Sequence, residues 1–191
     1  MKQPKPYYVF LFASRNKDNH NVNDFKQRKY SFVSNHPIED FKSEFERFVE
    51  SGKPGETSRW YVSVNSRNPE KLYKSVIHYL IDNPEVDFSQ FNRILASLAN
   101  KPEMSLTHRF LFDFDGDSNL IDEIKAMIVK ESGPSISKGH QQSIEVFNTY
   151  HNSGFIVEHG FDTRQLLADY PDLTLKRDAM KFITAKTKSG E

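Results

Sequence analysis

The sequence predicts one α/β domain of the α+β kind, with a mixed, largely antiparallel β-sheet flanked by helices. Three observations lead to this class. The chain has 191 residues, enough for one domain with a hydrophobic core. Short aromatic and β-branched runs alternate with segments whose apolar residues recur every three to four positions, the patterns of strands and amphipathic helices. Aromatic residues make up 13% of the chain and supply core material that disordered chains lack.

Strand character appears in five segments. The first is an uninterrupted apolar and aromatic run that starts at Tyr7, and the last two are separated by a short turn ending at Gly154, which is typical of a hairpin. The expected strands are residues 7–13, 59–65, 108–115, 143–148 and 154–158.

A polar loop is expected at residues 14–29, after the first strand. Residues 1–30 contain seven Lys or Arg against two Asp. Two interpretations stay open for this basic loop: a solvated surface loop, or a contact with phosphate or nucleic acid.

Helical periodicity appears in six segments. Asn68 and Pro69, for example, provide an N-cap and a first turn. The expected helices are residues 36–49, 68–80, 87–99, 118–131, 163–168 and 175–183. Residues 1–185 are expected to form the single domain, in which the helical block 68–100 could be a lobe inserted between strands, and residues 186–191 a polar tail.

Composition excludes several classes of protein. The chain has no cysteine, which rules out disulfides, thiolate metal sites and Cys nucleophiles. Lys plus Arg and Asp plus Glu both total 26, so no bulk charge favours nucleic acid or an anionic membrane. No segment has the length of a membrane span or the form of a signal peptide. We therefore expect a cytoplasmic protein with no membrane partner.

Candidate chemistry is densest in residues 112–119, where Asp113 and Asp115 project to one face of a strand end. Two adjacent carboxylates repel each other, and a divalent cation relieves that repulsion best. The alternative is a solvated acidic strand end. Asp117 could join the pair or cap the following helix.

Two unrelated families have motifs similar to the acidic segment that starts at Asp113. Residues 113–116 match four positions of the DxDGT motif of haloacid-dehalogenase-like phosphatases, in which the first Asp is a nucleophile, but Asp117 replaces the Thr. An EF-hand loop also begins D-x-D-x-D, but Ser118 stands where its Gly is required and the preceding segment has strand character.

The run from Phe110 to Asp115 also resembles the first motif, hhhDhD, of the archaeo-eukaryotic primase superfamily, which includes small phage and plasmid primase-polymerase-like proteins. Residues 149–164, with a Gly-aromatic turn, an apolar strand and then Phe-Asp, resemble its second-motif region. The order and spacing agree over residues 59–183. The resemblance implies an RRM-like sheet with added helices and offers Asp178 as a third acid.

One position departs from this family, because Ile156 stands where the second-motif His is expected. His151 or His159 could occupy equivalent space, and we favour His151 as the catalytic histidine. A catalytically inactive member of the superfamily is therefore an open alternative.

The resemblance implies a metal-dependent nucleotidyltransferase of DNA primase or polymerase type, with Asp113, Asp115 and Asp178 binding Mg²⁺ or Mn²⁺. Its partners would be nucleoside triphosphates, single-stranded or primed DNA and a separate helicase, in the host cytoplasm if the protein is viral. The expected nucleotide-binding residues are Arg59, Lys138, Ser153 and Arg164. The alternative is an inactive primase-like phage protein that binds nucleic acid, a nucleotide or a host protein; a DxDG phosphatase is third.

Overall fold

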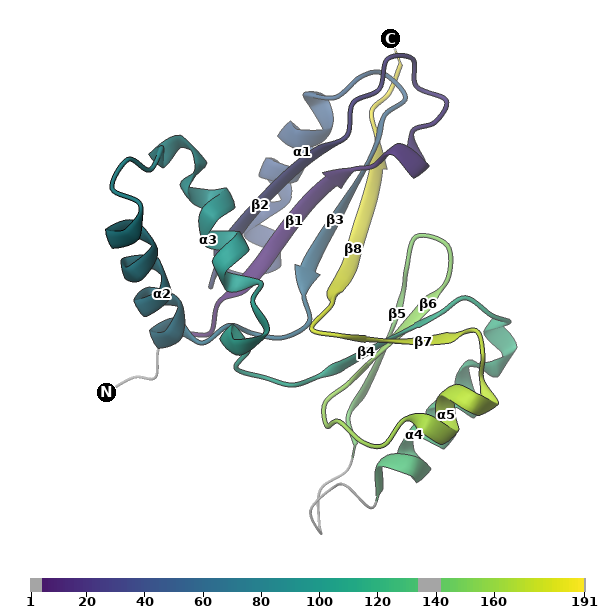
Figure 1. Ribbon diagram of the computed structural model, residues 1–191. Coiled ribbons are helices and arrows are strands. Elements are labelled where there is room, and N and C mark those ends of the chain that lie inside the picture. Colours follow the sequence, from purple (N-terminus) through teal and green to yellow (C-terminus); the bar gives the residue numbers. More distant parts are fainter. Residues whose placement is uncertain (1–4, 134–141, 191) are drawn as a thin grey trace.

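Two four-stranded antiparallel sheets form the framework of the protein, seen in Figure 1. The structure is a computed structural model that describes residues 5–133 and 142–190. The strands are β1 (Tyr8–Ser14), β2 (Arg28–Ser34), β3 (Thr57–Ser63), β4 (Phe110–Phe114), β5 (Ile144–Asn148), β6 (Ser153–Val157), β7 (Leu173–Arg177) and β8 (Met180–Thr187). The helices are α1 (Lys42–Glu50), α2 (Pro69–Asp82), α3 (Phe91–Ala99), α4 (Ile121–Ser132) and α5 (Arg164–Asp169). The predicted α+β class is confirmed, with the strands in two sheets instead of one.

The first sheet has the strand order β2-β1-β3-β8, and α1 covers one of its faces. An aromatic core fills the space beneath α1: the Phe12 ring lies 5.2 Å from that of Phe45 and 5.4 Å from that of Trp60. On the other face, Val9 packs in a second cluster with Leu72 of α2 and with α3. The apolar periodicity of residues 36–49 thus has its physical basis in this core.

The second sheet has the order β5-β6-β4-β7, and α4 and α5 pack on one of its faces. Along the chain the elements run β4-α4-β5-β6-α5-β7, with β4 and β6 in the centre, which is the ferredoxin-like split βαβ arrangement. Its core includes Phe112, Phe114 and Phe155, all at most 1% exposed. The expected RRM-like sheet is confirmed in this half of the molecule.

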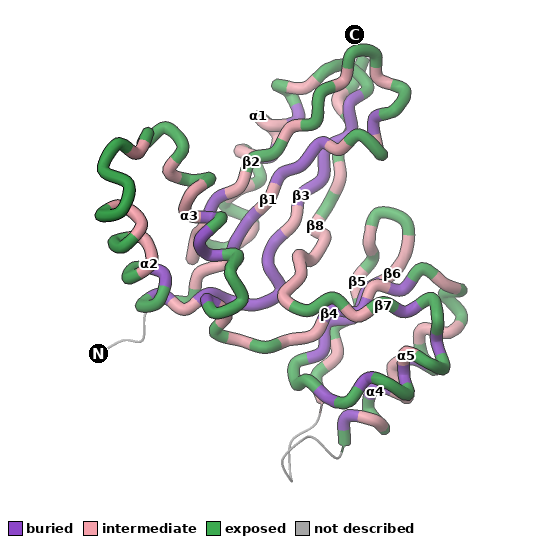
Figure 2. The backbone as a smooth tube through the Cα atoms, in the orientation of Figure 1, coloured by how far each residue is buried: buried purple, intermediate pink, exposed green. Residues whose placement is uncertain are grey.

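The second sheet is inserted into the first, because β3 and β8 are neighbours in space while all of β4 to β7 lies between them in sequence. Val64, which follows β3, packs against Leu111 of β4 and Ile156 of β6, on the sheet face opposite α4 and α5. Figure 2 shows buried positions along β1 and β3 and again where the two sheets meet. The helix-free face of the second sheet therefore turns toward the first sheet.

One predicted helix is wrong. Residues 175–183 form the end of β7, a tight turn and the start of β8. Asp178 in that turn has a φ of 49°, which a right-handed helix does not accommodate. Leu173 and Leu175 both pack on the second core, so the apolar pattern here has a period of two rather than 3.6. The strand β2 was also not predicted, since its first residues fall within the segment read as a polar loop.

The helical block after residue 68 is an α2–α3 pair. The Asn68 side chain accepts a hydrogen bond from the backbone N–H of Lys71, and Pro69 occupies the first turn, as the sequence predicts. The pair contacts the first sheet mainly through α3 and β2 (Figure 1). Within the described ranges, no helix combines the length and apolar character needed to cross a membrane.

Candidate functional site

A cavity of about 330 Å³ lies between the two sheets. Its walls come from the loop after β1, from β3 and β8 of the first sheet, and from β4, β7 and the β5–β6 turn of the second. Most of the lining residues are polar or aromatic, and Leu111 and Met180 are apolar: Arg15, Lys17, Arg59, Tyr61, Leu111, Asp113, Asp115, Phe147, Thr149, Tyr150, His151, Asn152, Lys176, Met180 and Phe182. Segments that are far apart in sequence thus contribute to one concave site.

The basic side of the cavity is organised around one buried carboxylate, Asp18. Its side chain is 3% exposed and forms ion pairs with Arg59 and with Arg15, whose Nε lies 3.1 Å from Asp18 Oδ2. Asp18 sits in a 3₁₀ turn, Asn16–Asp18, directly after β1. This turn therefore fixes two guanidinium groups at the cavity wall, while Lys17 adds a third positive charge there.

Aromatic rings line the cavity next to these cations. The Arg59 guanidinium carbon lies 4.0 Å from the centre of the Tyr150 ring, a close cation–π contact. Tyr150 also contacts His151, with the ring centres 4.5 Å apart, and the Tyr61 and Phe182 rings lie 5.8 Å apart. Planar apolar surface and fixed positive charge are thus side by side.

The acidic side of the cavity holds Asp113 and Asp115, each with a different partner. Asp113 on β4 forms an ion pair with Lys176 on the neighbouring strand β7. Asp115, just beyond β4, accepts a 2.6 Å hydrogen bond from Asn152 Nδ2 in the β5–β6 turn. The two carboxylates line one cavity, as their spacing predicts, but their charges are not compensated in the same way.

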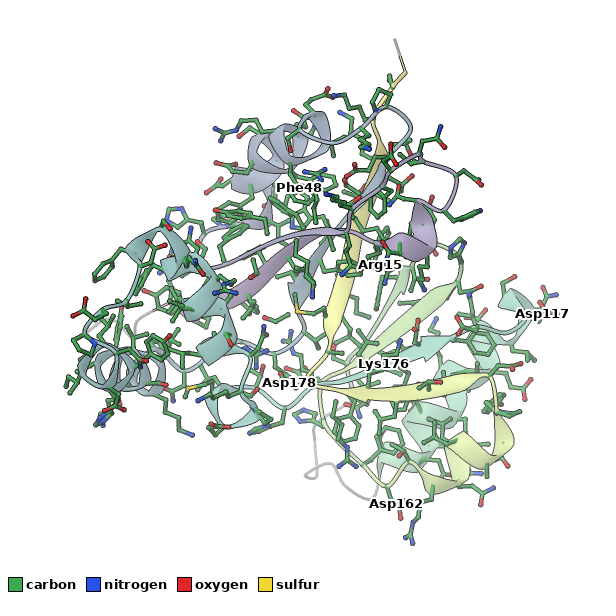
Figure 3. All side chains as sticks on the ribbon, turned by 45° about the horizontal axis from the view of Figure 1, so that its top comes forward. Arg15, Phe48, Asp117, Asp162, Lys176 and Asp178 are labelled. Carbon is green, nitrogen blue, oxygen red and sulfur yellow. The ribbon has the colours of Figure 1, made fainter. Side chains whose placement is uncertain are left out.

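The third expected metal ligand, Asp178, lies outside this cavity. Both of its carboxylate oxygens accept hydrogen bonds from Arg67 Nη1, at 2.7 and 2.9 Å, and Ser105 Oγ donates a third at 3.0 Å. Figure 3 places Asp178 where the chain passes from β7 to β8, at the junction of the two sheets. No cluster of three or more His, Asp or Glu suited to a metal ion occurs among the residues that the structure describes. The three-acid set of a two-metal centre is therefore not assembled here.

Only some of the remaining expected site residues line the cavity. Arg59 and His151 line the cavity with the acidic pair, whereas Ser153 begins β6 one residue beyond the cavity-lining Asn152. Arg164 begins α5 on the other side of the second sheet, where its hydrogen bonds lower the pKa of its neighbour Asp162 to about 2. Figure 3 shows Asp162 far from Lys176. Lys138 lies outside the described residues.

Ile156, at the position of the expected second-motif histidine, is 6% exposed and lies directly opposite Leu111 on β4. Both side chains belong to the small apolar cluster between the sheets. This position therefore serves packing between the sheets, and the histidine that lines the cavity is His151 in the β5–β6 turn.

Sequence reasoning did not single out Arg15, Lys17, Asn152 or Lys176 as site residues. The local excess of positive charge in residues 1–30 was a usable signal for the first two, because the loop that carries it supplies the basic wall. Nothing in the sequence marks Lys176, because the apolar spacing of residues 175–183 also fits a helix.

Comparison with protein-family models, with curated proteins and with solved structures found no match for this chain.

Proposed function

We propose that the cavity between the two sheets binds a nucleotide or the phosphate-bearing end of a nucleic acid strand. The observation that carries this proposal is the combination of Arg15, Lys17, Arg59 and Lys176 with several aromatic rings in the lining of a single cavity. A phosphate group needs the cations, and a nucleobase needs the flat apolar surface.

The arginines are suited to phosphate because their positions are fixed before a ligand arrives. Arg59 is 5% exposed and is held from one side by Asp18 and from another by the Tyr150 ring. A guanidinium group presents several N–H donors in one plane, which matches phosphate oxygens better than an ammonium group does. Since Asp18 is shared by two arginines, the basic wall keeps a net positive charge.

The aromatic lining and the volume fit the rest of such a ligand. Tyr61, Tyr150 and Phe182 offer stacking surfaces, and stacking of one base on an aromatic side chain contributes roughly 1–3 kcal/mol. The volume of about 330 Å³ lies at the small end of the range of ligand pockets, which favours one nucleotide over a long strand segment.

The test is a binding titration with a fluorescently labelled nucleoside triphosphate and, separately, a labelled single-stranded oligonucleotide. Arg59→Gln is expected to weaken binding at least tenfold, because charge-assisted hydrogen bonds contribute about 1.5–3 kcal/mol. The matched control is Arg47→Gln on α1, whose side chain is 76% exposed and belongs to the helix on the opposite face of the first sheet. Equal loss in both variants, or no binding by the wild type, would contradict the proposal.

A second candidate function is metal-dependent nucleotidyl transfer of the DNA primase or polymerase type. The observation that favours it is that Asp113 and Asp115 line the same cavity as the cations and as His151. Mg²⁺ or Mn²⁺ would then be held by this pair without Asp178, which is bound to Arg67.

Nucleotide incorporation on primed and unprimed single-stranded DNA, in Mg²⁺ or Mn²⁺, separates the two candidates. Incorporation that is lost in the Asp113→Asn/Asp115→Asn double variant supports the transferase. Nucleotide binding that survives both EDTA and this double change, without any incorporation, supports a non-catalytic binding protein.

A further inference from the structure

We propose that Lys176 takes the place of a divalent cation at Asp113, so that the cavity binds its ligand without a metal. The ligand in this proposal rests on the proposed function, whereas the pairing of Lys176 with Asp113 stands on the geometry of the second sheet alone. The proposal accounts for how the partly buried carboxylate of Asp113 is compensated, although the third expected acid, Asp178, pairs with Arg67.

The register of β4 and β7 brings the two side chains together. Asp113 pairs with Thr174 and Leu111 pairs with Lys176, so Asp113 and Lys176 are diagonal neighbours on one face of the sheet. The Lys176 ammonium group contacts Asp113 Oδ2 directly. The Asp113 side chain is 24% exposed, so its charge is only partly solvated and a fixed counter-charge matters.

On the other side of Asp113, an aromatic ring covers the neighbouring strand. On β6 the residue opposite Asp113 is Gly154, which provides no side chain. The Phe147 ring lies over this glycine so closely that an added Cβ would come within 2.5 Å of it. A metal-coordinating side chain from β6 therefore has no room beside Asp113. Lys176 is the charged side chain that the strand register places next to it.

This arrangement opposes a metal ion at Asp113. A cation that entered would have to displace the Lys176 ammonium group and would then remain near its positive charge. Asp115 is engaged by Asn152, and the third expected acid forms its ion pair with Arg67. Lys176 can instead contact a ligand phosphate directly, because its side chain is 47% exposed at the cavity.

The experiment titrates Mn²⁺ alone into the full chain and measures the free ion by electron paramagnetic resonance. The variants are Lys176→Ala, Lys176→Glu, Asp113→Asn, and each Lys176 variant combined with Asp113→Asn. Lys181→Ala is the matched control, because Lys181 on β8 also forms an ion pair with a carboxylate, that of Glu145 on β5. Thermal unfolding of every variant confirms that it is folded.

The wild type and Lys181→Ala are expected to bind Mn²⁺ equally weakly, whereas Lys176→Ala gains affinity and Lys176→Glu gains at least tenfold. Asp113→Asn should abolish both gains. Mn²⁺ binding by the wild type that depends on Asp113, or no gain in either Lys176 variant, would overturn the proposal.

A parallel titration with the labelled nucleoside triphosphate completes the test. Wild-type affinity is expected to be the same in EDTA and in Mg²⁺, and a tenfold or larger requirement for Mg²⁺ would overturn metal-free binding. A chain that binds no nucleotide under either condition contradicts the proposed function, and the Mn²⁺ titration still decides the role of Lys176 at Asp113.

Discussion

Two buried arginines, Arg59 and Arg67, each form an ion pair with an aspartate, yet their surroundings differ. Arg67 is completely buried and binds Asp178 where the segment before α2, the segment before β4 and the β7–β8 turn meet. Arg59 is nearly as buried, but its partner Asp18 lies in a 3₁₀ turn and its guanidinium group borders the cavity.

The charge of Arg67 stabilises the fold, whereas the charge of Arg59 can also reach a ligand. The carboxylate of Asp178 is bound by Arg67, Ser105 and Asn65, and these contacts join the two sheets. Arg59 shares Asp18 with Arg15, which leaves excess positive charge directed at an open cavity. A buried arginine–aspartate pair is therefore evidence for a ligand site only where a cavity adjoins it.

Replacing Asp178 should have the largest effect on stability. Asp178→Ala leaves the Arg67 guanidinium buried without a counter-charge, which is expected to lower the free energy of unfolding by about 3–5 kcal/mol. Urea denaturation measures this loss, with Asp162→Ala as the control, because Asp162 is exposed at the surface. An Asp178→Ala protein of wild-type stability would show that Asp178 is free for another role, such as the metal ligand that the sequence predicts.

Removing the partner of Arg59 should cost less. Asp18→Ala is expected to lower the free energy of unfolding by about 2 kcal/mol, since hydrogen bonds to charged groups contribute about 1.5–3 kcal/mol and the cavity lets water reach the Arg59 guanidinium. The same urea experiment tests this value. A loss as large as that of Asp178→Ala would mean that solvent and ligands reach Arg59 no better than Arg67, which would contradict the role of Arg59 in the cavity.

A third ion pair joins Arg28 and Glu56. Its loss should have the smallest effect on the free energy of unfolding, and that effect should depend on pH. Burial opposes ionisation of Glu56, but hydrogen bonds from the Lys53 backbone and from Arg28 outweigh it, so the pKa of Glu56 lies below its usual 4.5. A lowered pKa in the folded state contributes stability above pH 4.5 that is lost as the pH falls through the folded value.

Glu56→Gln should lower the free energy of unfolding by about 1 kcal/mol at pH 7, because the amide oxygen of Gln can still accept the hydrogen bonds but carries no charge. The difference from the wild type should shrink below pH 4.5 in unfolding curves recorded at successive pH values. A difference that stays constant from pH 7 to pH 3 would contradict the assignment of the pKa shift to Glu56.

Many elements of the fold can be predicted from the sequence, because their residue types and spacings are typical of one secondary structure. The Phe stripe of α1, the Asn68–Pro69 start of α2 and the hairpin of β5 and β6 each follow from spacing within a few residues. The helix predicted at residues 175–183 is wrong because the apolar residues there have spacings that fit a helix as well as two strands. The turn at Asp178 depends on Arg67, more than a hundred residues away, and no local pattern reveals it.

The candidate site shows the same limit. The spacing of Asp113 and Asp115 on a strand end, and their neighbourhood to His151, could be inferred from motifs alone. The positive excess in residues 1–30 indicates a basic surface, but its place beside the acidic pair could not be inferred, because it requires the loop after β1 to fold against β3, where Asp18 meets Arg59. Which charges face a cavity is decided by long-range packing rather than by local spacing.

The most direct test of the account is to locate the bound nucleotide by NMR. A ¹⁵N-labelled sample is titrated with a nucleoside triphosphate in EDTA, and the shift of each backbone amide is followed. The largest changes are expected at the cavity walls, around Lys17, Tyr150 and Lys176. No change at millimolar ligand, or changes centred on the α2–α3 pair, would contradict a nucleotide site between the two sheets.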